Sequence, residues 1–390
     1  MLARAAGVSF LLLFASLPWS IAPMSIAATL CITLTLAEGA ARREMGWLKT
    51  PVLIPGLGWL LALGIASLVG QAGIWHPLTK AILLLLVPVV AYHAREERVA
   101  RVALVVLFAS ALIATSYALA GFLARGGVFP ARVRGAVGHP VTYGGQALLL
   151  TSLALAIAIR ARQRRWRFGA VGLLLLLLPA LLGSYTRSAW LGVVTAAAII
   201  VALTRARWFL ALAAAIAIGL AVSPSGYRER ALSSFDPASR WNVERVHMWE
   251  AGARMFHDHP ITGVGLRDFA KVYEQYKSPG AHERAGHLHS VWVHVAATMG
   301  VIGLVALVAL IVGLFRAASR GMRAGLRDRA SPSKPGAWIS TAIQLGVVAG
   351  LAGFLVAGLF EWNFGDEELV NLLYSLVGLA YAAGGNWRDR

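Results

Sequence analysis

The chain has 390 residues, of which 58% are hydrophobic and only 14% charged, with a formal net charge of +18. A soluble domain carries roughly 25% charged residues, so this composition excludes an ordinary water-soluble protein and predicts a chain with lipid as its solvent. The single cysteine, Cys31, lies in an apolar run, which excludes a disulfide framework and a cysteine-based metal site.

Apolar runs recur along the chain at about the 20-residue length that spans a bilayer. We predict spans at 6–22, 24–40, 52–70, 77–93, 102–124, 140–159, 169–184, 188–204, 208–222, 288–315, 337–360 and 367–386. The first run continues into the second without a small-residue cleavage site, which favours a retained helix over a signal peptide. The expected fold is therefore an all-α polytopic membrane protein with about twelve transmembrane helices.

The basic residues predict the orientation. With both termini placed in the cytoplasm, every inner connection carries Arg or Lys, as the positive-inside rule requires. We expect an N-terminal bundle of nine spans over 1–222, one large outer loop over 223–287, and three C-terminal spans over 288–390.

Several arginines stand in short outer loops, where cations are unexpected: Arg125, Arg132, Arg134 and Arg187. Arg187 lies in a tight turn between two spans, and a charge at that depth costs several kcal/mol unless it is paired or faces a wet cavity. An anion-binding site explains such a charge, and so does snorkelling towards lipid headgroups.

The outer loop contains a predicted amphipathic helix that ends at Pro260. Its apolar residues recur at three- and four-residue spacing: Val246, Trp249, Ala253 and Phe256. Arg245 falls one turn before Trp249 and is expected to point into the same cavity as Arg187, although a solvated helix face is the plainer interpretation of Arg245 and Arg254. A glycine turn at 263–265 and a second helix over about 266–276 follow.

Two histidines, His287 and His289, stand where the next apolar run begins. Residues two apart do not face each other on a helix, so we favour a general base over a metal site, with an interfacial helix cap as the plain alternative. The last outer turn carries Glu361 and Asp366 between aromatic residues. These acids either cap a helix in an aromatic belt, or one of them pairs with an outer Arg or orients His289.

Four segments together resemble the O-antigen ligase and polymerase superfamily of bacterial envelope glycosyltransferases. They are Gly-Ser-Tyr-Thr-Arg-Ser at 183–188, Arg245-x-x-x-Trp249 with His-Pro-Ile-Thr-Gly-Val-Gly at 259–265, His289 followed by Gly-Val-Ile-Gly-Leu at 300–304, and Arg-Gly-Ala-Val-Gly-His-Pro at 134–140. The chain departs from the family pattern at Ser290 and His139, where the family usually has Asn.

The resemblance implies a type C-like glycosyltransferase architecture with a large periplasmic helical loop in the bacterial inner membrane. It implies metal-independent, inverting transfer of O-antigen polysaccharide from undecaprenyl diphosphate to a sugar hydroxyl of the lipid A-core, with no cofactor and no nucleic acid as partner. The catalytic residues carried over are His289 as base and Arg187 and Arg245 for the diphosphate. The predicted substrate-binding residues are Arg132, Arg134, Arg254, His287, Tyr185 and Trp249.

Other functions remain open. An O-antigen polymerase and a protein O-oligosaccharyltransferase share these motifs, and overall likeness favours the ligase. A transporter of anionic lipids is a further alternative, but a transporter is expected to carry charges at mid-depth in its spans, whereas here the charges gather on one face. The sequence leaves open whether His287 or His289 is the base, and what Glu361 and Asp366 do.

Overall fold

A computed structural model of the protein describes residues 1–71, 79, 82–205, 225–233, 236–327 and 337–385. Within these ranges the chain is helical, with no strand. The N-terminal half contains α1 (Leu2–Ser16), α2 (Ile21–Arg42), η1 (Gly46–Leu48), α3 (Leu53–Gly70), α5 (Leu86–His93), α6 (Glu97–Ala124), α7 (Pro140–Arg160), α8 (Arg164–Gly183) and α9 (Arg187–Arg205). The remainder contains α11 (Ser225–Leu232), α12 (Arg240–Asp258), α13 (Phe269–Tyr276), α14 (Val291–Ala318), α15 (Met322–Arg327), α16 (Ala337–Ala357), η3 (Asn363–Gly365) and α17 (Glu367–Ala383).

In the described part of the chain, eight helices are long and apolar enough to cross a membrane: α2, α3, α6, α7, α8, α9, α14 and α16. They confirm a polytopic helical membrane protein and correspond to eight of the predicted spans. The other four predicted spans are not matched in this way. The run 6–22 yields a helix of 15 residues and the run 367–386 one of 17, the run 77–93 is described only in part, and the run 208–222 lies outside the described residues.

The first two helices correct one predicted boundary. The chain turns at 17–20, and α2 already begins at Ile21, so Pro23 lies inside its first turn instead of separating two helices. Proline is tolerated there because the first backbone N–H groups of a helix have no partner within it.

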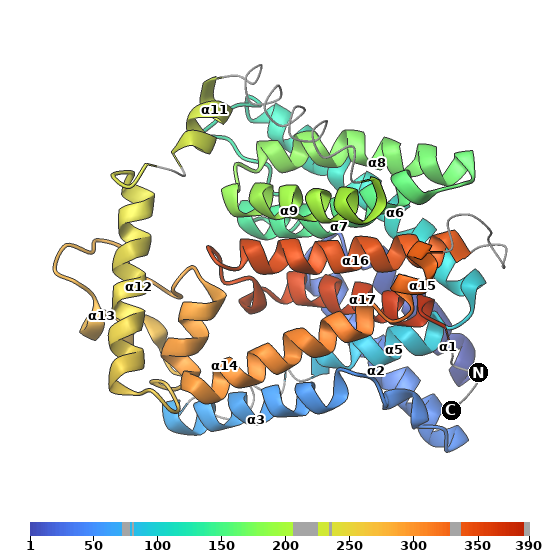
Figure 1. The fold of residues 1–390 in the computed structure, drawn as a ribbon, viewed down its shortest axis with the longest axis horizontal. Coiled ribbons are helices and arrows are strands. Elements are labelled where there is room, and N and C mark those ends of the chain that lie inside the picture. Colours follow the sequence, from blue (N-terminus) through green and yellow to red (C-terminus); the bar gives the residue numbers. More distant parts are fainter. Residues whose placement is uncertain (72–78, 80–81, 206–224, 234–235, 328–336, 386–390) are drawn as a thin grey trace.

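The long helices form a bundle in which α16 packs against α7 and α9, α14 against α3, and α17 against α5 (Figure 1). Helix α12 crosses one end of this bundle, at the left of the view, from near α11 to the middle part of α14, where Val301 N donates to Pro260 O. The start of α1 and the end of α17 both lie towards the opposite end of the bundle. The polar loop is therefore gathered over one end of an apolar bundle.

Helix α14 is not the uninterrupted span predicted for 288–315. It is broken at Gly300, whose φ of 60° and ψ of −156° are open essentially to glycine alone. The loop after α12 enters this break, since the backbone N–H of Val264 donates to Ala297 O at 2.9 Å and that of Val301 donates to Pro260 O at 2.9 Å. A Cβ at Gly300 would lie 2.4 Å from the backbone of Ile261, so the break and the loop require each other.

The outer loop has a small core of its own. It is formed by Met248, Ala251, Met255, Val264, Val272, Tyr273, Ala285, Leu288 and Ala297. Two residues of the predicted apolar face of α12 lie outside this core, because Val246 is 49% exposed and Ala253 is exposed too. Loop residues, and not only the bundle, cover α12, so its buried stripe is rotated relative to the predicted one. The buried Glu244 ties the returning chain down by accepting from the backbone N–H groups of His282 and Glu283.

Candidate functional site

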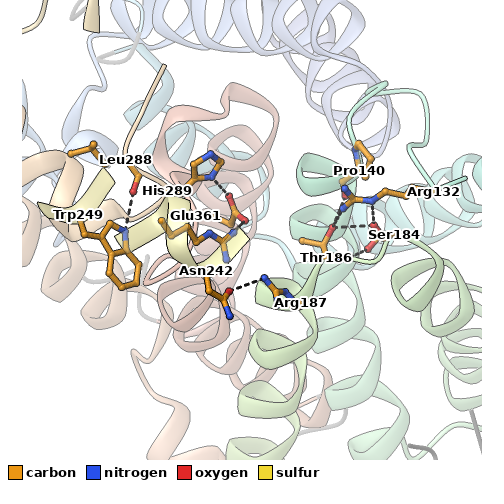
Figure 2. Close-up of polar contacts among 11 residues, drawn as sticks. Arg132, Pro140, Ser184, Thr186, Arg187, Asn242, Trp249, Leu288, His289 and Glu361 are labelled. Carbon is orange, nitrogen blue, oxygen red and sulfur yellow. Dashed lines mark hydrogen bonds and ion pairs between the residues drawn. The ribbon is translucent and has the colours of Figure 1, made fainter. Parts of the chain in front are cut away.

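A chain of three polar side chains joins the outer loop to the bundle end. The Glu361 carboxylate accepts from Arg245 Nη2 at 2.6 Å through Oε1, and its Oε2 lies 3.0 Å from His289 Nδ1. Figure 2 shows His289, from the segment before α14, meeting Glu361, from the segment after α16. Arg245 reaches the same carboxylate from α12. The acid of the turn after α16 therefore contacts both an arginine of α12 and the histidine, two contacts that the sequence offered only as alternatives.

Local backbone geometry directs His289 towards this acid. His289 has a φ of 44°, in the left-handed region that few residues other than glycine adopt. The next residue, Ser290, is the N-cap of α14 and accepts from Val293 N. Asparagine is an equally good N-cap, so this departure from the family pattern keeps the physical role of the position. Val291 N also donates to Gly358 O at 2.8 Å, which holds the start of α14 beside the end of α16.

Burial and neighbouring positive charge shift the pKa of Glu361 in opposite directions. Its side chain is 8% exposed, and burial alone would raise its pKa. The hydrogen bond with His289 and the positive charge of Arg245 outweigh burial, so the pKa of Glu361 lies below its usual value. The group is a carboxylate at neutral pH and can hold the Nδ1 proton of His289, which leaves Nε2 as the proton acceptor.

Arginines from four separate segments gather beside this chain: Arg132, Arg187, Arg230 and Arg245. Arg187, at the start of α9, donates to Asn242 Oδ1 at 3.2 Å (Figure 2). It also donates to Ser233 Oγ at 3.1 Å, so both of these partners are neutral. Arg132 holds the turn before α9, donating to Ser184 O at 2.7 Å and Thr186 Oγ1 at 3.2 Å. Neutral partners orient these guanidinium groups without cancelling their charge.

The arginines repel one another. Burial, and then the charge of Arg230, lower the pKa of Arg132 to about 10. Burial and the charge of Arg245 likewise lower the pKa of Arg230. Arg132 therefore stays charged at neutral pH, and the guanidinium groups together give the site a positive potential that favours a multiply charged anion.

The two histidines lie side by side, which corrects one sequence argument. His287 and His289 precede α14 and are not helical, and their ring centroids are 4.4 Å apart. Ligand atoms of His287, His289 and Glu361 lie within 4.8 Å of one another, a spacing that could hold a metal ion. The guanidinium of Arg245 on Glu361 opposes a divalent cation at that point, because it already neutralises the carboxylate. Burial, and then the charge of His289, lower the pKa of His287 to about 4, so His287 is neutral at pH 7.

The structure does not bring every predicted site residue into this cluster. Arg254 donates to Tyr276 O and Ser278 Oγ and so fastens the end of α13 to α12. Trp249 Nε1 donates to Leu288 O at 3.1 Å and supports the segment that carries His289. Arg134 is exposed, and its charge acts on Arg132.

Tyr185 stacks on Tyr227 of α11, with centroids 4.7 Å apart and an interplanar angle of 11°. This contact docks α11 beside the turn that holds Arg187 and thereby brings Arg230 to the cluster. The sequence analysis did not single out Arg230 or Asn242, because neither has a recognisable spacing to the other site residues. The one sequence feature that could have indicated them is their position in a loop that contains many arginines.

One stretch of the chain, from within α8 to within α14, matches a known protein family. Residues 172–308 match the O-antigen ligase family. The match confirms the resemblance to the O-antigen ligase and polymerase superfamily, whose members are glycosyltransferase-like enzymes. It covers Arg187, Arg245 and His289, whereas the sequence candidates Arg132 and Glu361 lie outside the matched residues and are brought beside them by the fold. No curated protein matches the chain.

Proposed function

We propose that the protein is an O-antigen ligase, which transfers O-antigen polysaccharide from undecaprenyl diphosphate to a sugar hydroxyl of the lipid A-core. The observation that carries the proposal is the Arg245–Glu361–His289 chain beside three further arginines at one end of a membrane bundle. The reaction is assigned to the periplasmic face of the bacterial inner membrane, with both termini cytoplasmic. No metal or other cofactor takes part.

His289 is the base in this mechanism. Its Nε2 takes the proton of the acceptor hydroxyl as that oxygen forms a bond to the anomeric carbon of the donor sugar. The bond between this carbon and the diphosphate oxygen breaks, and the electron pair leaves with the diphosphate. Glu361 holds the imidazole in the required tautomer and stabilises the imidazolium that forms, as a carboxylate does behind a catalytic histidine. Direct attack of this kind inverts the anomeric centre.

Arg187 and Arg245 bind the diphosphate and stabilise the charge that develops as the bond breaks. A planar guanidinium binds phosphate oxygens with two parallel hydrogen bonds, which a lysine cannot do. The neutral partners of Arg187 support this role, since they leave its charge available to the substrate. Arg132 and Arg134 contribute positive potential from the loop before α7.

A lipid A-core acceptor distinguishes a ligase from the related polymerases and protein O-oligosaccharyltransferases. We favour the ligase on overall likeness of the chain, with its single dominant outer loop and its Glu-Trp-Asn-Phe-Gly-Asp turn at 361–366. The polymerase is the alternative against which the experiment is designed.

The test is the lipopolysaccharide of cells that carry only His289→Ala, compared with cells that carry His257→Ala. The His257 side chain is 90% exposed on α12 and serves as the matched control. A ligase predicts core without O-antigen and accumulation of full-length lipid-linked polymer in the first strain only. Core capped by a single repeat unit would indicate a polymerase. An unchanged ladder, with expression verified, would mean that His289 is structural and would contradict the proposal.

A further inference from the structure

A cavity of about 370 Å³ lies next to the site, and Arg132, Arg187, Arg230 and Arg245 are not among its lining residues. Its walls come from α3, α14, α17 and the loop that enters the break in α14, and include Trp59, Leu63, Met299, Val370 and Tyr374. In Figure 1, α3 lies on one side of the bundle and α9 and α11 lie on the other, with α14, α16 and α17 between them. The cavity and the arginine cluster therefore approach the site from opposite sides.

In two short segments, one residue belongs to the polar site and its neighbour in the chain lines the cavity. Glu361 and His287 belong to the polar site, whereas the adjacent Trp362 and Gly286 line the cavity. His294 also lines the cavity and is packed against Trp362, with ring centroids 4.4 Å apart. A molecule in the cavity would thus lie against residues that directly adjoin Glu361 and His287 in the chain.

The chemistry of the cavity suits an amphiphile. Its walls are mainly aliphatic and aromatic, and its volume is within the range of about 300–1,000 Å³ that ligand pockets have. One cation, Arg267, is among its lining residues; it is exposed and donates to Val69 O at 3.0 Å. A hydrocarbon chain inside the cavity and an anionic group at Arg267 would satisfy both features.

The direction of attack identifies which substrate this amphiphile is, and this step rests on the proposed function. In an inverting displacement the nucleophile approaches the sugar on the face opposite the leaving group. The arginines hold the leaving diphosphate on the α9 and α11 side. The acceptor must therefore come from the other side, where the cavity lies.

We propose that the cavity bounded by α3, α14 and α17 holds the apolar anchor of a lipid-linked acceptor glycan, with an anionic group of that acceptor on Arg267. The cavity places the acceptor hydroxyl at His289, while the donor lipid stays on the arginine side. The anchor provides apolar binding energy that a water-soluble acceptor lacks.

The test uses the full chain in lipid nanodiscs, with a polyprenyl diphosphate-linked glycan as donor and either a lipid-anchored glycan or its delipidated form as acceptor. Leu63→Trp fills the cavity, and Leu61→Trp on the same helix is its control, because Leu61 is 67% exposed. Arg267→Gln removes the cation at an exposed position, and its control is Lys271→Gln, whose side chain is 82% exposed.

We expect Leu63→Trp and Arg267→Gln each to raise the KM for the lipid-anchored acceptor on the order of tenfold, a change of about 1.4 kcal/mol. The KM for the donor and the activity with delipidated acceptor should stay unchanged, and both controls should behave as the wild type. A raised KM for the donor would assign the cavity to the polyprenyl chain and overturn the proposal, as would unchanged kinetics for Arg267→Gln. Failure of the wild type to use the diphosphate donor at all would instead reject the proposed function.

Discussion

Replacing Glu361 with Gln tests whether the buried carboxylate both holds Arg245 and orients His289. Breaking a buried ion pair by removing one partner costs about 3–5 kcal/mol. The Arg245 side chain is 22% exposed, so water recovers part of this loss, and we expect the variant to be less stable by about 2–3 kcal/mol. The amide keeps the size of the side chain but cannot stabilise an imidazolium. General base catalysis contributes about 10²–10⁴-fold, and we expect transfer to fall on the order of 10²–10³-fold.

The assay is single-turnover transfer by purified protein, with a melting curve measured on the same sample. The matched control is Asp366→Asn in the same turn, since the Asp366 carboxylate accepts from Thr142 Oγ1 at 3.0 Å. Asp366→Asn should retain transfer with at most a small loss of stability. Near wild-type transfer by the folded Glu361→Gln variant would refute the reasoning, because the carboxylate would then be only a structural partner of Arg245.

Four further predictions follow from the same geometry. Arg187→Lys should lose at least tenfold in transfer because a point charge cannot replace the guanidinium fork, while Arg228→Lys on the exposed face of α11 should not; equal rates would reject the assignment. Gly300→Ala should destabilise the protein by at least about 1–3 kcal/mol through backbone strain alone, whereas Gly64→Ala, with nothing near its Cβ, should melt as the wild type does. His287 is protonated less readily folded than unfolded, so its contribution to stability is present above about pH 6.5 and is lost as the pH falls towards 4; His287→Gln should flatten this part of the melting profile. A chelator should leave transfer unchanged, and restoration of activity by a specific divalent ion after its loss would overturn metal independence.

Much of the architecture follows from the sequence because lipid imposes a simple rule. A helix that crosses hydrocarbon must be apolar over about 20 residues, so composition alone predicts spans such as α6 and α16 within a few residues. The same rule does not decide whether a shorter apolar helix crosses the membrane. Helices α1 and α17 are 15 and 17 residues long, and only their packing in the bundle shows their place.

The break in α14 shows a limit of hydropathy. Gly300 sits in an apolar run and reads as part of a continuous span. The break exists because the backbone of residues 260–265, distant along the chain, donates to and accepts from α14 at that point. A backbone pairing of this kind leaves no mark on the polarity of the side chains.

Some of the catalytic candidates could be recognised from the sequence, and others only from the tertiary structure. Sequence patterns and family resemblance were enough to single out Arg187, Arg245 and His289, because cations in short outer loops and a histidine at the start of a span are unusual in a membrane protein. The partners of these residues were decided by the tertiary structure. Glu361 reaches His289 from 72 residues further along the chain, and Arg230 reaches the cluster through stacking of Tyr227 on Tyr185. Such contacts depend on which helices lie side by side, and a single sequence carries no record of that order.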